Sequence, residues 1–65
     1  MKIIVNGSEL DLGVATLAEA LEALNYAGAV VATALNGHFV AARARETTRL
    51  AHGDKIEIVA PRQGG

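Results

Sequence analysis

Cysteine is absent from this chain of 65 residues, and aromatic side chains are scarce, with no tryptophan, one phenylalanine and one tyrosine. Without cysteine there is no disulfide framework, no thiolate-held iron–sulfur cluster and no cysteine-based zinc site. The shortage of aromatics removes the stacking platforms on which single-stranded nucleic acids are bound. Because 51% of the residues are apolar, we expect an aliphatic hydrophobic core to hold the fold together.

An excess of charge of one sign is also lacking, since the formal net charge is −1. Such a balance gives no general attraction to DNA, RNA or acidic membranes. The apolar run at residues 3–5 is too short for a signal peptide or a membrane span. We therefore expect a soluble cytoplasmic protein that binds neither nucleic acid nor membrane, and the missing cysteines agree with a reducing compartment.

Two Asn-Gly pairs, Asn6-Gly7 and Asn36-Gly37, lie between runs of apolar residues. Both residue types tolerate the positive φ angles that a two-residue hairpin turn requires, so each pair predicts a β-hairpin. The strands that the pairs join are expected at residues 2–5 with 8–12, and at 30–35 with 38–40.

A helix is predicted between the two hairpins. Thr16 and Glu19 match the capping-box pattern, with Thr16 as the N-cap and Glu19 at the third helical position. Gly28 is expected to end the helix, because glycine adopts the left-handed conformation common just beyond a helix C-terminus. Three leucines at spacings of four and three form one apolar stripe, which predicts one buried face: Leu17, Leu21 and Leu24.

The C-terminal third is less regular. Residues 41–53 are expected to form an exposed loop with one short helical turn, in which Leu50 is the core anchor. Gly53-Asp54 predicts a turn into a half-buried strand at 55–59, where charged and apolar residues alternate. Pro61 ends that strand because proline has no N–H for the hydrogen-bond ladder.

This order of elements predicts an α+β fold. A mixed five-stranded sheet with one helix across one face buries a single helical stripe most economically, and this is the β-grasp arrangement. Its first and last strands are expected to lie side by side and parallel. A single domain at residues 1–60, followed by a flexible tail at 61–65 that ends in Gly64-Gly65, is expected from this length.

Three segments together resemble the thiamine-biosynthesis sulfur carrier proteins. They are residues 31–37 (Val-Ala-Thr-Ala-Leu-Asn-Gly), residues 50–58 with the Gly-Asp turn, and the terminal Gly64-Gly65. The resemblance covers essentially the whole chain, and the family is related to the small subunit of molybdopterin synthase and more distantly to ubiquitin. The chain departs from the family after Val40, where Pro-Arg and then an aromatic are common. Here Ala41-Ala42 and Arg45 occupy those positions, which puts partner contacts of that loop in doubt.

The resemblance implies a carrier that is acted on by enzymes and is not itself one. An E1-like adenylating enzyme would use ATP to activate the Gly65 carboxylate, and a sulfur donor protein would convert it to a thiocarboxylate. Thiazole synthase would then take the sulfur for thiamine. Arg62, Gln63 and Gly64 would thread the carboxylate into the enzyme, since glycines are narrow and proline limits flexibility at the base. No catalytic residue, metal or bound cofactor is expected, and the free protein is expected to be a monomer.

The other candidate residues can also be explained without a binding or catalytic role. His38 and His52 are isolated, whereas a metal site needs three or four converging ligands. The arginines of the C-terminal half are either a solvated surface or docking contacts for acidic residues of a partner. On the strand at 30–35, one of two apolar rows is expected to be partly open, either Val31/Thr33/Leu35 or Val30/Ala32/Ala34.

Three rival functions stay open at this point. The first is a sulfur carrier for another pathway, such as molybdopterin, cysteine or tRNA thiolation. The second is a stand-alone β-grasp interaction module, which would not need a terminal Gly64-Gly65. The third is a ubiquitin-like modifier joined to lysines through the same activated carboxylate. Formation of a thiocarboxylate at Gly65 separates the carriers from the other two.

Overall fold

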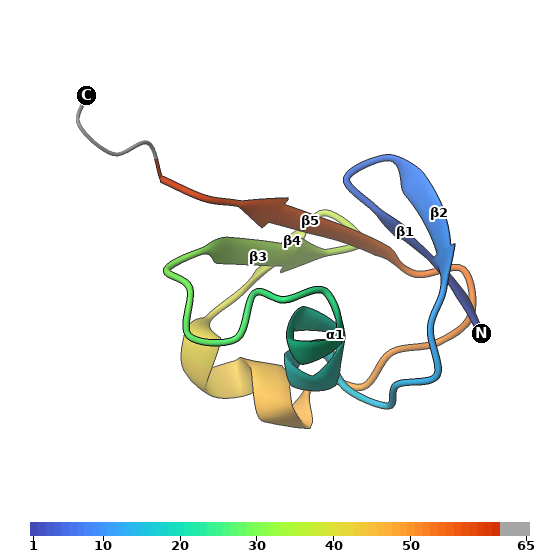
Figure 1. Cartoon of the computed structure of the whole chain (residues 1–65), viewed down its shortest axis with the longest axis horizontal. Coiled ribbons are helices and arrows are strands. Elements are labelled where there is room, and N and C mark those ends of the chain that lie inside the picture. The colour runs from blue at the N-terminus through green and yellow to red at the C-terminus, as the bar shows by residue number, and fades with distance from the viewer. Residues whose placement is uncertain (62–65) are drawn as a thin grey trace.

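Five strands and two helices account for the regular structure in the computed structural model, which describes residues 1–61. The strands are β1 (Lys2–Val5), β2 (Ser8–Asp11), β3 (Ala32–Leu35), β4 (His38–Val40) and β5 (Lys55–Val59). The helices are α1 (Leu17–Ala23) and the 3-10 helix η1 (Ala42–Thr47). All five strands join one sheet in the order β2-β1-β5-β3-β4, in which β1 and β5 are parallel and the other pairs antiparallel (Figure 1). The predicted β-grasp fold is confirmed.

The two predicted hairpins form at the Asn-Gly turns, with positive φ at both residues of each turn. Their asparagine side chains also hold β5 in place. The Asn6 amide accepts from the Ile58 N–H at 2.8 Å and donates to the Ile58 carbonyl at 3.1 Å. The Asn36 amide accepts from the Lys55 N–H at 3.0 Å and donates to Asp54 Oδ1 at 3.0 Å. Each turn therefore closes a hairpin and fastens the central strand.

The start of α1 follows the prediction, with one difference in the capping box. Thr16 is the N-cap, and its Oγ1 accepts from the Glu19 N–H at 3.2 Å. The Glu19 carboxylate reaches back past the cap and accepts from the Ala15 N–H at 2.7 Å. The Thr16 side chain thus satisfies a backbone donor that the first helical turn leaves without a partner, and the Glu19 side chain satisfies the donor just before the cap.

The predicted end of α1 at Gly28 was wrong. Asn25 occupies the left-handed position after the helix with φ of 67°. The Tyr26 N–H then bonds to the Leu21 carbonyl and the Asn25 N–H to Glu22, which is the Schellman arrangement. Gly28 instead serves a separate turn, in which the Ala29 N–H bonds to the Tyr26 carbonyl at 2.9 Å. Asparagine tolerates this conformation, so the chain leaves the helix earlier than the glycine indicated.

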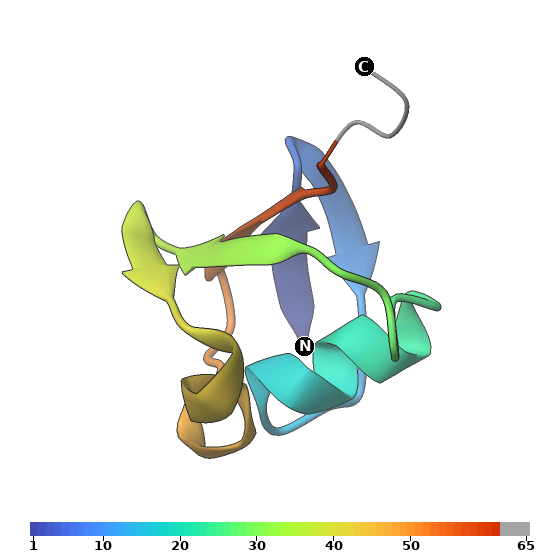
Figure 2. The same cartoon turned by 90° about the vertical axis from the view of Figure 1, so that its left-hand side faces the viewer.

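The core lies between the sheet and α1. Figures 1 and 2 show α1 and η1 covering the same face of the sheet, while no helix of residues 1–61 covers the opposite face. We call these the inner and outer faces. Leu50 and Leu24, the C-cap residue of α1, are half-buried and pack against the core. The fully or nearly buried apolar side chains are Ile3, Leu17, Ala20, Leu21, Val40, Ile56 and Ile58.

The segment between β4 and β5 contains more helix than the single turn predicted, because η1 spans six residues. Arg45 of η1 is half-buried and bonds to β3 and to the residue before it. Its Nε donates to Thr33 Oγ1 at 3.0 Å and its Nη2 donates to the Val31 carbonyl at 2.7 Å. Thr33, 2% exposed, in turn donates to the Val40 carbonyl at 2.8 Å. This network joins η1 to β3 and β4.

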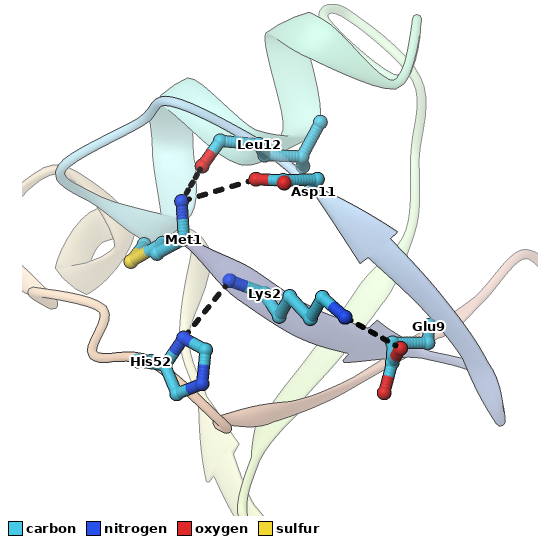
Figure 3. Close-up of polar contacts among 6 residues, drawn as sticks. All are labelled: Met1, Lys2, Glu9, Asp11, Leu12 and His52. Carbon is cyan, nitrogen blue, oxygen red and sulfur yellow. Dashed lines mark hydrogen bonds and ion pairs between the residues drawn. The ribbon is translucent and has the colours of Figure 1, made fainter.

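The N-terminal end of β1 is held by polar contacts to the residues around the end of β2 and to the loop before β5 (Figure 3). The Met1 ammonium donates to Asp11 Oδ1 at 3.1 Å and to the Leu12 carbonyl at 3.2 Å. His52 Nδ1 accepts from the Lys2 N–H at 3.2 Å, which joins the loop before β5 to β1. His52 therefore has a structural hydrogen bond here, and residues 1–61 contain no group of three or more His, Cys, Asp or Glu that could hold a metal ion.

Candidate functional site

The residues predicted to carry the chemistry, Arg62, Gln63, Gly64 and Gly65, lie outside the described residues. The structure gives the place from which they continue. Because β5 is parallel to β1, its C-terminal end lies at the opposite end of the sheet from the start of β1 (Figure 1). Ala60 and Pro61 follow β5 as exposed residues. The candidate site within the described residues therefore comprises this exit and the sheet surface beside it.

An apolar patch lies on the outer face next to this exit. It consists of Ala32 and Ala34 of β3, Phe39 of β4 and Val59 of β5, and we call it the outer patch. The strand register places Ala32 opposite Val59 and Ala34 opposite Phe39. Phe39 is 74% exposed and Val59 is 63% exposed. Large apolar side chains grouped on an open surface are a common sign of a partner site.

The position of the outer patch resolves the choice that the strand at 30–35 left open. Thr33 is buried, and Val31 and Leu35 pack against the core, so this row faces the helix. Ala32 is exposed and Ala34 is half-buried, so their row is the open one. The regular strand begins at Ala32, two residues later than predicted, and Val30 before it is 79% exposed.

Within the outer patch there is a hollow of about 180 Å³, whose lining also includes Thr33 and Glu57. Because the alanines are short, the hollow lies over β3 between the larger side chains of β4 and β5. Small-molecule sites typically enclose roughly 300–1,000 Å³, so a space of this size suits side chains of a protein partner better.

A second hollow, of about 620 Å³, lies on the outer face nearer the start of β5. The two Asn-Gly turns bound it, together with Ile4, Lys55 and Glu57. Its lining combines turn backbone and the apolar Ile4 and Ile56 with the charged Lys55 and Glu57. Glu57 borders both hollows, so it stands at the boundary between the charged and apolar parts of the outer face.

The arginines considered for docking are in different environments. Arg45 is held inside the fold by its bonds to Thr33 and Val31. Its guanidinium therefore serves a structural role and is a poor candidate for docking a partner. Arg43 and Arg49 are exposed, and neither forms an ion pair within the described part of the chain. The docking hypothesis for these two remains a prediction. Arg62 lies outside the described residues.

Sequence reasoning missed Phe39 and Val59 as parts of one surface. The alternation at 55–59 already places Ile56 and Ile58 on one face and Val59 on the other. That Phe39 joins Val59 depends on β3 lying between β4 and β5, and strand order is a property of the tertiary fold.

Comparison with known proteins decides the family. The ThiS family model matches residues 3–65, which is nearly the whole chain. The chain belongs to the ThiS family. A crystal structure of the thiamine biosynthesis protein ThiS from Geobacter metallireducens is similar to this ThiS-family protein, with 32% identity and a TM-score of 0.82. The similarity covers 100% of both chains.

No curated protein matches this ThiS-family chain significantly. Within residues 1–61, no helix has the length and apolar character needed to cross a membrane.

Proposed function

We propose that this protein is a sulfur carrier of thiamine biosynthesis, acted on by enzymes and not itself a catalyst. The observation that carries the proposal is the family match, which extends through Gly64-Gly65 at residues 3–65. The similarity to a thiamine biosynthesis protein over the full length of both chains supports the pathway. The open sheet face beside the exit of β5 supports a role in which another protein docks on the body and receives the tail.

The chemistry requires activation of the Gly65 carboxylate, because its negative charge repels nucleophiles and oxide is a poor leaving group. A carboxylate oxygen attacks the α-phosphorus of ATP in the adenylating enzyme, which forms an acyl-adenylate and releases pyrophosphate. Hydrosulfide supplied by a donor protein then attacks the acyl carbon, AMP leaves, and loss of the sulfur-bound proton gives the thiocarboxylate. The resulting thiocarboxylate gives its sulfur to thiazole synthase.

The globular part positions this carboxylate for a partner. Residues 61–65 span at most about 17 Å when extended, which is enough to enter a channel while the body stays outside. Glycines at the end keep the segment narrow and let enzyme backbone approach closely. We propose that the outer patch is the docking surface for the adenylating enzyme, because it lies next to the strand end from which the tail continues.

Intact mass spectrometry tests the proposal. The protein is incubated with ATP, magnesium, an E1-like adenylating enzyme and sulfide, and the mass of the whole chain is measured. We expect one oxygen to be replaced by sulfur, and fragmentation to place the change at Gly65. Omitting ATP, or deleting Gly65, should abolish the change.

Two results would contradict the proposal. The first is an unchanged mass under conditions that load a known sulfur carrier, which would favour a plain interaction module. The second is the appearance of lysine-linked conjugates in cell extract, which would indicate a ubiquitin-like modifier. The pathway is tested separately by giving the loaded protein to thiazole synthase and following sulfur into the thiazole product.

A further inference from the structure

On the outer face, some charged side chains form an ion pair and others do not. On the β2 and β1 side, Lys2 Nζ lies 3.5 Å from Glu9 Oε1 and forms an ion pair (Figure 3). On β5, Lys55 and Glu57 are both exposed on this face. The ion pairs within residues 1–61 are Lys2 with Glu9 and the Met1 ammonium with Asp11, so no cation of this part of the chain pairs with Glu57.

Glu57 is also the charged residue that borders the outer patch. Ala34 is its partner across the β3–β5 register, and Phe39 is the partner of Ala34 on β4. Glu57 lines the small hollow within the patch as well as the larger one beside it. Because its cross-strand neighbour is a short alanine, nothing on β3 covers the carboxylate. A protein that covers the outer patch must therefore also cover Glu57.

Covering this carboxylate has an energetic consequence. A carboxylate that loses its water and gains no partner is strongly destabilising, whereas a cation with good geometry offsets the loss. We propose that Glu57 determines partner specificity, and that the protein docking on the outer patch places an arginine or lysine over its carboxylate within an apolar contact. This inference rests on the proposed function, since it takes the adenylating enzyme as that protein.

The same charge argues against a second copy of this chain as the occupant. In a symmetric dimer each patch faces itself, and a two-fold axis that passes at Glu57 brings the two Glu57 side chains together, whereas another axis position places Glu57 against a different residue of the second copy. Like charges brought together at an interface oppose association. A partner that presents a cation to Glu57 avoids this repulsion.

The test compares three variants by their affinity for the adenylating enzyme. Glu57→Gln removes the charge and Glu57→Lys reverses it. Glu22→Lys is the matched control, since Glu22 is exposed on α1 and lies on the helix that covers the inner face. We expect Glu57→Lys to weaken binding roughly thirtyfold or more, Glu57→Gln by less, and Glu22→Lys to change it little. All three should unfold at the same temperature as the original chain, because the substituted side chains are exposed.

The kinetics of sulfur loading separate this inference from the proposed function. Glu57→Lys should raise the KM for the carrier while kcat stays near its original value, since the carboxylate of Gly65 is unchanged. Reversal of the contacting arginine or lysine of the enzyme to glutamate should restore binding of Glu57→Lys. If the original chain is loaded and Glu57→Lys binds as tightly as Glu22→Lys, the inference is overturned and the proposed function stands. If the original chain is not loaded at all, both fail.

Discussion

Asn6 combines two roles that are separable by substitution. Its backbone has a positive φ of 48°, and its side chain makes two hydrogen bonds to Ile58 of β5. Asn6→Gly keeps the backbone conformation accessible and removes only the amide. We expect a loss of about 1–2 kcal/mol in the free energy of unfolding, measured by urea denaturation, because two backbone groups of β5 lose their partners.

Asn25 provides the control for that measurement. It also has a positive φ, at 67°, but its side chain makes no hydrogen bond within residues 1–61. Asn25→Gly should therefore leave stability unchanged within about 0.5 kcal/mol, or raise it slightly. Equal losses from both glycine variants would show that the Asn6 side chain contributes nothing beyond its backbone conformation.

Arg45 gives a second prediction at the residue scale. Its guanidinium bonds to the Thr33 hydroxyl and to the Val31 carbonyl at once, which requires the planar fork of arginine. Arg45→Met should lower the free energy of unfolding by about 1–3 kcal/mol in urea denaturation. Arg45→Lys should recover little of this, because an ammonium does not reproduce the fork. Arg43→Met, on the same 3-10 helix but exposed, should stay within about 0.5 kcal/mol.

At the scale of elements, α1 depends on its N-cap more than a long helix would. It has seven residues, and helices this short are marginal without capping and packing. Thr16→Ala removes the acceptor for the Glu19 N–H and should lower the free energy of unfolding by about 1 kcal/mol. Thr16→Ser keeps the hydroxyl and should cost less than half as much. Thermal unfolding followed by circular dichroism distinguishes the two, and equal losses would argue that the Thr16 methyl group matters more than its cap.

The elements themselves could be predicted from local chemistry. The Asn-Gly turns, the Thr16 cap and the alternation at 55–59 each act through neighbouring residues, so their signals are present in the sequence. The helix end was misplaced because Asn25 and Gly28 both tolerate a left-handed backbone. Which of the two ends α1 depends on where the chain must turn back toward β3, and that is set by packing.

The candidate site could be predicted only in part, for a related reason. Gly64-Gly65 is predicted as the site from its place after the last strand and from resemblance, and it lies outside the described residues. The outer patch depends on Phe39 and Val59 meeting across Ala32 and Ala34, and these residues are brought together by the strand order β5-β3-β4. The bonds of Arg45 to β3 are likewise long-range contacts, which no local pattern indicates.

At the scale of the whole molecule, the two faces of the sheet differ in what covers them. One face packs against α1 and η1 and supplies the core (Figure 2). The other face is covered by no helix of the described residues, and it carries the outer patch, Glu57 and the exit of β5. A 65-residue chain buries only about 60% of the surface of its unfolded form, so its stability is modest and depends on the covered face.

Two adjacent residues of β5 test this division. Ile58 is 6% exposed on the inner face, and Val59 is 63% exposed on the outer face. Ile58→Ala should lower the free energy of unfolding by about 2–5 kcal/mol, which is a large share of the stability of a small domain. Val59→Ala should lower it by less than about 1 kcal/mol, because the side chain is mostly exposed and only strand preference is lost.

If the outer patch docks the adenylating enzyme, sulfur loading should rank the two variants in the opposite order, with Val59→Ala affected more than Ile58→Ala. Loading is measured by intact mass at a temperature where both variants remain folded, as checked by circular dichroism. Under these conditions Val59→Ala should raise the KM for the carrier severalfold, since it removes apolar contact area from the interface. Ile58→Ala should load with a nearly unchanged KM once it is folded. A Val59→Ala variant that loads like the original chain would place the docking surface elsewhere on the molecule.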